Sequence, residues 1–82
     1  MKLYIVYRDE EDGMIYVARL TGVATTVAGP FRDAGVAHAH AARLAGPRAV
    51  RGTWPAEFQV SEREYADELR VETLPRECYI VR

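Results

Sequence analysis

A segment rich in alanine, Phe31–Ala45, lies between two Gly-Pro pairs and limits the folds open to this chain more than any other feature. Alanine has the highest helix propensity and the segment contains no proline, so we predict a helix here. Gly46-Pro47 marks its end, because glycine suits the position just past a helix and proline cannot continue one. The expected buried face is mostly alanine, which lets the helix approach a neighbouring layer closely.

Leu44 is the largest side chain on that predicted face. At about 100° per residue, the positions that share it are Ala34, Ala37, Ala41, Leu44 and Ala45. Since the other members are alanines, Leu44 is expected to supply much of the buried apolar area. Replacement of Leu44 by alanine is therefore expected to cost about 2–5 kcal/mol of stability.

Three apolar segments ahead of the helix predict an antiparallel β-meander. Leu3–Tyr7 is apolar at every position, which is typical of a strand in the interior of a sheet. An Asp-Gly pair then separates it from Met14–Leu20, and such a pair between two apolar runs predicts a hairpin. β-Branched residues alternate through Val23–Val27 and indicate a third strand, which Gly29-Pro30 is expected to end.

The second half of the chain has a less regular pattern. Arg48–Trp54 fits either a short strand or an irregular crossing, and Glu57–Val60 resembles a strand. Ser61 followed by Glu64 fits a capping box, which predicts a short helix over about residues 62–69.

A competing interpretation makes residues 69–73 a strand, and both interpretations hold if the helix is short. A turn at Leu74–Glu77 would then lead into a final strand, Cys78–Val81.

These elements predict one α+β domain over residues 1–82. We expect an antiparallel sheet with one main helix packed on one face. The sheet would combine the three-stranded N-terminal meander with one or two C-terminal strands, and a second short helix would complete the domain. A chain of this size buries only a small core, which favours a binding surface over a deep cleft.

Composition excludes several classes of protein. The chain is 49% hydrophobic and 28% charged, with a net charge of −1, so a bulk electrostatic attraction to nucleic acid is not expected. A single cysteine permits no intramolecular disulfide. The sequence contains neither a signal peptide pattern nor an apolar run long enough for a membrane span, so we expect a cytoplasmic protein.

The residues that could carry chemistry are few. His38 and His40 lie two apart on a predicted helix and point about 200° apart, so they cannot share a metal ion. Cys78 falls in a predicted strand without a helix N-terminus to activate it, which is typical of a small buried apolar residue. We therefore expect no catalytic residue, metal or cofactor. A small dimeric enzyme, with a site between its two subunits lined by His38, His40 or Cys78, is a further hypothesis.

Charge is unevenly distributed along the chain. Net charge is −2 over residues 1–12, +4 over residues 13–56 and −3 over residues 57–82. A basic and aromatic cluster could stack on a base or anchor a protein interface; its members are Arg43, Arg48, Arg51 and Trp54. The acidic third could imitate nucleic-acid phosphates toward a basic partner through Glu64, Tyr65, Asp67 and Glu68. The alternative for the basic cluster is that Trp54 lies in the core and the arginines are solvated. The alternative for the acidic third is an ordinary negative surface.

The order Glu11–Ala18, Leu20-Thr21-Gly22 and the alanine-rich helix resembles the N-terminal part of HicB-type antitoxins, which have a hairpin, a third strand and a helix. The similarity covers about residues 3–45. It departs at Thr21, where the family has proline, and no DNA-binding tail follows. The resemblance implies an antitoxin-type regulator.

We therefore expect a small non-enzymatic protein-binding module. One such role is that of an inhibitor from a phage or mobile element that occludes a host nuclease complex, as anti-CRISPR proteins do. The alternative is a nucleic-acid-binding or HicB-like regulator that uses the cluster around Trp54. Exposed sheet edges or helix contacts would also permit a homodimer.

Overall fold

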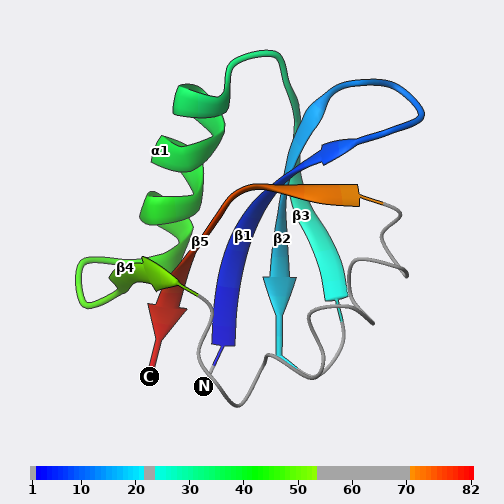
Figure 1. Ribbon diagram of the computed structural model, residues 1–82. Coiled ribbons are helices and arrows are strands. Elements are labelled where there is room, and N and C mark those ends of the chain that lie inside the picture. The colour runs from blue at the N-terminus through cyan, green and yellow to red at the C-terminus, as the bar shows by residue number, and fades with distance from the viewer. Residues whose placement is uncertain (1, 22–23, 54–70) are drawn as a thin grey trace.

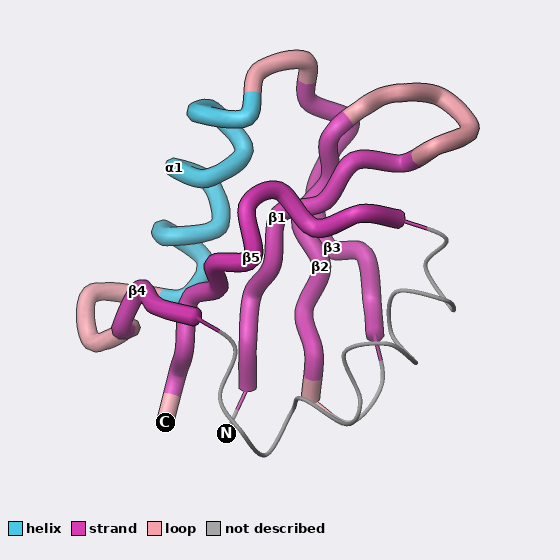
Figure 2. The backbone as a smooth tube through the Cα atoms, viewed as in Figure 1, coloured by secondary structure: helices cyan, strands magenta, loops and turns pink. Residues whose placement is uncertain are grey.

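The computed structural model describes residues 2–21, 24–53 and 71–82, and for residues 71–77 it describes the backbone alone. The elements in chain order are β1 (Lys2–Asp9), β2 (Ile15–Leu20), β3 (Ala24–Phe31), α1 (Ala34–Ala45), β4 (Val50–Thr53) and β5 (Val71–Val81). The strands form one antiparallel sheet in the order β3-β2-β1-β5-β4 (Figure 1). This architecture confirms the predicted α+β class, with α1 on one side of the strands (Figure 2).

Side chains are buried on both faces of the sheet. The core on the α1 side consists of Tyr4, Val6, Ile15, Val17, Ala37, Ala41, Ala45 and Tyr79. The core on the opposite face consists of Leu3, Ile5, Tyr7, Ala18, Leu20, Cys78 and Ile80. Residues of β1 alternate between the two cores, which explains why its sequence is apolar at every position. The prediction of an interior strand is therefore confirmed, since β1 pairs with β2 and β5.

The predicted hairpin joins β1 to β2. The amide of Asp9 donates to the Met14 carbonyl (2.9 Å) and the amide of Gly13 donates to the Asp9 carbonyl (2.8 Å). Gly13 has φ of 69°, a conformation that glycine adopts without strain. The carboxylates of Asp9 and Asp12 accept from the backbone amides of Glu11 and Met14, so two of the acids at the tip also build the turn.

The alanine-rich helix is present and ends where its sequence predicts. Asp33 caps its start by accepting from the Gly35 amide (2.7 Å). At its end Gly46 has φ of 92°, and its amide donates to the carbonyl of Ala42 (3.0 Å). The helix therefore begins three residues later than Phe31, after a capping residue, and stops at Ala45.

The predicted position of Leu44 is wrong. Ala37, Ala41 and Ala45 are buried at a spacing of four residues, and this ridge rests on the sheet. Leu44 points about 100° around the helix from Ala45, and 42% of its surface is exposed. The large loss of stability expected for Leu44→Ala therefore no longer applies.

Gly29-Pro30 does not end the third strand. β3 continues to Phe31 through a cis peptide bond at this pair, with shifts of register against β2 between Ile15 and Ala18. An edge strand tolerates proline, because one row of its backbone groups needs no partner in the sheet. The sequence pattern alone did not distinguish an edge strand from the end of a strand.

In the second half, β4 confirms the short strand and β5 confirms the final strand. The predicted turn at Leu74–Glu77 is wrong. The register of β5 against β1 shifts between Ile5 and Tyr7, so these four residues form a bulge, and β5 pairs antiparallel with β1 on both sides of it. The strand predicted at 57–60 and the helix predicted at 62–69 lie outside the described residues. In the part of the chain that is described, no helix is long and apolar enough to cross a membrane.

Candidate functional site

One row of side chains crosses all five strands on the α1 side of the sheet. Its members, paired from strand to strand, are Arg51, Tyr79, Tyr4, Arg19 and Thr25. Directly paired residues of neighbouring strands share a face. Both tyrosines are 5% exposed and belong to the core under α1, whereas both arginines are exposed. The helix therefore covers two tyrosines and leaves an arginine on each side.

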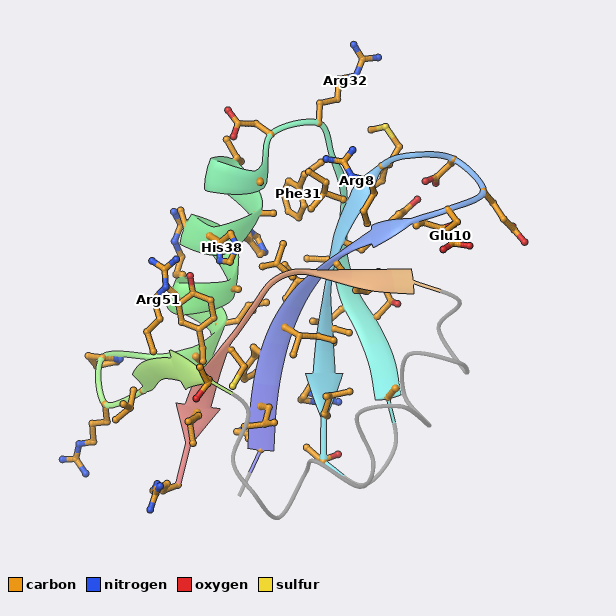
Figure 3. The ribbon with its side chains drawn as sticks, viewed as in Figure 1. Arg8, Glu10, Phe31, Arg32, His38 and Arg51 are labelled. Carbon is orange, nitrogen blue, oxygen red and sulfur yellow. The ribbon has the colours of Figure 1, made fainter. Side chains whose placement is uncertain are left out.

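At one end of this row, Arg51, Tyr79 and His38 join β4, β5 and α1. The guanidinium carbon of Arg51 lies 5.7 Å from the centre of the Tyr79 ring. The Tyr79 hydroxyl and His38 Nδ1 share a hydrogen bond of 2.9 Å. Figure 3 shows His38 and Arg51 on the same side of the molecule. The cluster fixes the tyrosine ring and places a cation over its outer face.

Further arginines gather around this cluster. Arg43 lies in the last turn of α1, Arg48 lies in the connection to β4 and Arg82 follows β5, and all three are exposed. We call the surface of Arg43, Arg48, Arg51 and Arg82 the basic end. Val50, next to Arg51, is 58% exposed and pairs with Ile80, so it lies on the face of the sheet opposite α1. The basic end thus consists of exposed cations from α1, the connection to β4, β4 itself and the residue after β5.

The acidic residues of the hairpin lie at the other end of the sheet. β1 starts beside the basic end at Lys2, which pairs with Val81, and it finishes at Asp9 in the acidic turn. Figure 3 shows Glu10 on the far side of the molecule from Arg51. The acidic turn and the basic end therefore lie at opposite ends of β1, and Arg8, which donates to the Gly13 carbonyl, is a basic residue at the acidic end.

A shallow depression of about 290 Å³ lies at the end of the sheet where β1 starts and where β2 and β5 finish, next to Arg82 of the basic end. It is lined by Lys2, Thr21, Val81 and Arg82 and is open to solvent. Two of these four side chains are cationic, so the depression adds to the positive surface.

The structure brings together part of the predicted site. Arg43 of α1, Arg48 of the connection and Arg51 of β4 are all exposed, and their role in partner binding stays a prediction. The other predicted partner-binding residues, Trp54, Glu64, Tyr65, Asp67 and Glu68, lie outside the described residues. The sequence analysis missed the contact between His38 and Tyr79, because the two residues are 41 positions apart and no local pattern relates them.

The two histidines occupy opposite flanks of α1. His38 contacts Tyr79 of β5, whereas the His40 ring lies 5.4 Å from the ring of Phe31 in β3. This placement confirms that they do not converge on one point. Within the described ranges, no three histidine, cysteine or acidic side chains are grouped to hold a metal ion.

Cys78 is fully buried in the core opposite α1. Burial raises the pKa of its thiol to about 11, so the thiol stays protonated near neutral pH. A nucleophilic cysteine needs the opposite shift. The environment of Cys78 is that of a small apolar core residue, as predicted.

Tyrosine hydroxyls near the hairpin have structural hydrogen bonds. Tyr16 donates to the Asp12 carboxylate, which raises the pKa of Tyr16 to about 12 and lowers the pKa of Asp12. Tyr7 stacks on Tyr16 with ring centres 5.7 Å apart and shares a hydrogen bond with Thr26. Burial raises the pKa of Tyr7. These groups link β1, β2 and β3, and we assign them no chemical role.

Comparison with known proteins yields no match to a family model, to a curated protein or to a solved structure. The resemblance to HicB-type antitoxins therefore rests on the quoted residues alone and stays a prediction.

Proposed function

We propose that this protein is a non-enzymatic binding module whose basic end contacts an acidic surface of a protein partner. The observation that carries the proposal is that four exposed arginines lie on α1, on β4 and on the segments next to β4 and β5. Protein interfaces are enriched in arginine and aromatic residues. The basic end supplies the arginines, and Arg51 lies over the ring of Tyr79.

The Arg51 cluster makes the basic end suitable for binding. Tyr79 is held by its hydrogen bond to His38 and by burial under α1, and Arg51 lies over its ring. A side chain that is already positioned loses less conformational entropy when a partner binds. We therefore expect Arg51 to contribute more to affinity than Arg43 or Arg48.

The separation of charge supports an acidic partner. A molecule with cations at one end and the acidic turn at the other orients itself as it approaches a negative surface. Such steering raises the association rate, and salt weakens it. Binding should therefore slow as ionic strength increases.

Nucleic acid is the alternative ligand for the same arginines. One pair of variants tests both the protein partner and the nucleic acid. The double variant Arg48→Glu/Arg51→Glu removes the centre of the basic end. Arg32→Glu is the matched control, because this exposed arginine lies beside the start of α1 (Figure 3). We expect chemical cross-linking in a lysate of the source organism to recover one protein with the wild type and with the control, and at least about tenfold less with the double variant.

The same three proteins are then titrated with labelled single-stranded and duplex DNA and RNA at rising salt. Micromolar binding that falls steeply with salt and disappears in the double variant would replace the protein partner by nucleic acid. A captured partner that binds both variants equally would contradict the proposal. If the partner is a nuclease, loss of its cleavage on addition of this chain would support the inhibitory role.

A further inference from the structure

The outer edge of β3 is the longest accessible strand edge in the described sheet. β3 pairs with β2 on one side, and no described strand pairs with its other side. Thr25, Thr26 and Val27 are all exposed. The second half of β3 is protected by Gly29-Pro30, since proline has no amide hydrogen to donate. We call the remaining part, Ala24–Ala28, the β3 edge.

The β3 edge lacks the usual protection against pairing. Edge strands are commonly guarded by charged side chains, proline or extreme shortness. β3 contains no charged residue over its eight positions, whereas β4 has four residues including Arg51. A strand that is uncharged and rich in threonine and valine is well suited to pair with a further strand.

The neighbouring flank of α1 adds an apolar surface on the same side. Val36 and Leu44 lie one turn before and one turn after His40, so the three side chains form a ridge along the helix. His40 contacts Phe31 of β3, which shows that this ridge faces β3. Val36 is 54% exposed and Leu44 is 42% exposed. With Val27, three of the four large exposed apolar residues in the described part lie on the β3 side.

We propose that a second copy of this chain pairs with the β3 edge in antiparallel orientation. The two five-stranded sheets would then form one continuous sheet. An antiparallel pair has its two-fold axis normal to the sheet, so both copies of α1 lie on the same face. Both Val36–Leu44 ridges then lie on the same face of the joined sheet, and the strand pairing supplies the contact between the copies.

The absence of charge on β3 favours a second copy as the occupant. In a symmetric pair, a residue near the two-fold axis lies close to the same residue of the other copy. A charged residue there would be repelled by its equivalent. The β3 edge avoids this repulsion, and the net charge of −1 adds little repulsion between whole chains. By contrast, a β4–β4 pair would bring two basic ends together. The inference concerns the opposite edge from the proposed partner site and does not depend on it.

The strand pairing is short, so the dimer should be weak. Five paired residues span about 17 Å, which places the interface at the small end of specific interfaces. Sedimentation equilibrium between about 1 μM and 1 mM chain should show the mass rising from one chain of 9.2 kDa toward two.

Val27→Lys is the test variant and Val50→Lys is its matched control at the other edge. We expect Val27→Lys to weaken self-association at least about tenfold, because two lysines meet near the axis, and Val50→Lys to behave as the wild type. Thr25→Lys, at a second exposed position, should act like Val27→Lys, and circular dichroism checks that all three fold. A wild type that stays monomeric to 1 mM, or dissociation by Val50→Lys but by neither β3 variant, would overturn the proposal.

Discussion

The two edges of the sheet differ in length, in charge and in what holds them in place. β3 is uncharged and runs for eight residues, whereas β4 runs for four and lies within the basic end. A charged edge attracts a partner of opposite charge from a distance, whereas an uncharged edge offers backbone hydrogen bonds at contact. One small domain can therefore present two binding surfaces that respond differently to salt and to mutation.

The anchoring of the edges differs as well. β3 is held by Tyr16, whose ring lies against Gly29, and by the hydrogen bond between Tyr7 and Thr26. β4 is held through Arg51 over Tyr79. The β3 contacts are closer than the contact of Arg51 with Tyr79, so substitutions there should cost more stability than equivalent substitutions in β4.

Gly29→Ala should give the largest loss. Gly29 has φ of 122°, and an added Cβ would lie 2.6 Å from Tyr16 Cδ1 and 3.0 Å from the Ile15 carbonyl oxygen. Backbone strain and overpacking together should lower the free energy of unfolding by about 3 kcal/mol. Gly52→Ala in β4 is the control, because its Cβ would meet nothing within 4 Å, and should change stability by less than about 0.5 kcal/mol. Equal effects in urea unfolding would remove the distinction between the edges.

The contrast between these elements also shows what local sequence can predict. The apolar run of β1, the Asp-Gly hairpin and the alanine-rich helix follow from patterns within a few residues, and the structure confirms them. The continuation of β3 past Gly29-Pro30 and the bulge in β5 depend on pairing with distant strands. Local patterns do not include that information.

The candidate site was predicted in part for the same reason. Arg43, Arg48 and Arg51 are close in sequence, so their common surface could be expected. The contact of His38 with Tyr79 depends on how α1 crosses the sheet, and the exposure of Leu44 depends on which ridge of α1 rests on it. Alanines spaced by four residues set that ridge, and this spacing is present in the sequence itself.

Thr26→Val should have the next largest effect. It removes the hydroxyl that bonds to Tyr7, and Tyr7 is 4% exposed, so its own hydroxyl loses a partner in a largely buried site. We expect a loss of about 1.5 kcal/mol in the free energy of unfolding. Thr53→Val in β4 makes the same chemical change at an exposed position and should be nearly neutral. A loss in the control as large as in Thr26→Val would contradict the account.

Arg51→Met should have a smaller effect. It keeps an unbranched side chain over Tyr79 but removes the cation, so about 0.5 kcal/mol of stability should be lost. Arg48→Met, in the connection before β4, is the control and should be neutral. If thermal unfolding shows a loss above about 2 kcal/mol for Arg51→Met, β4 is held as firmly as β3.

The hydrogen bond between Tyr16 and Asp12 should make the free energy of unfolding depend on pH. The effect is small because both groups are accessible to solvent, which screens their interaction. The pKa of Tyr16 is raised to about 12, so its contribution to stability is complete below its ordinary value of 10.0 and is lost as pH rises toward 12. The pKa of Asp12 is lowered, so its contribution is complete above 3.8 and is lost as pH falls further.

A site-resolved NMR titration checks this assignment. Asp12→Asn should return the pKa of Tyr16 toward its ordinary value. A Tyr16 ionisation that does not move in Asp12→Asn would show that another group raises its pKa.

The central claim is that the β3 edge pairs with the β3 edge of a second copy, whereas the β4 edge does not pair with another β4 edge. A dilution series of amide NMR spectra on the wild-type chain tests it most directly. We predict shifts that depend on concentration for the amides of Ala24–Ala28, and none for Val50–Thr53. Spectra that do not change on dilution, or changes confined to Val50–Thr53, would contradict the account.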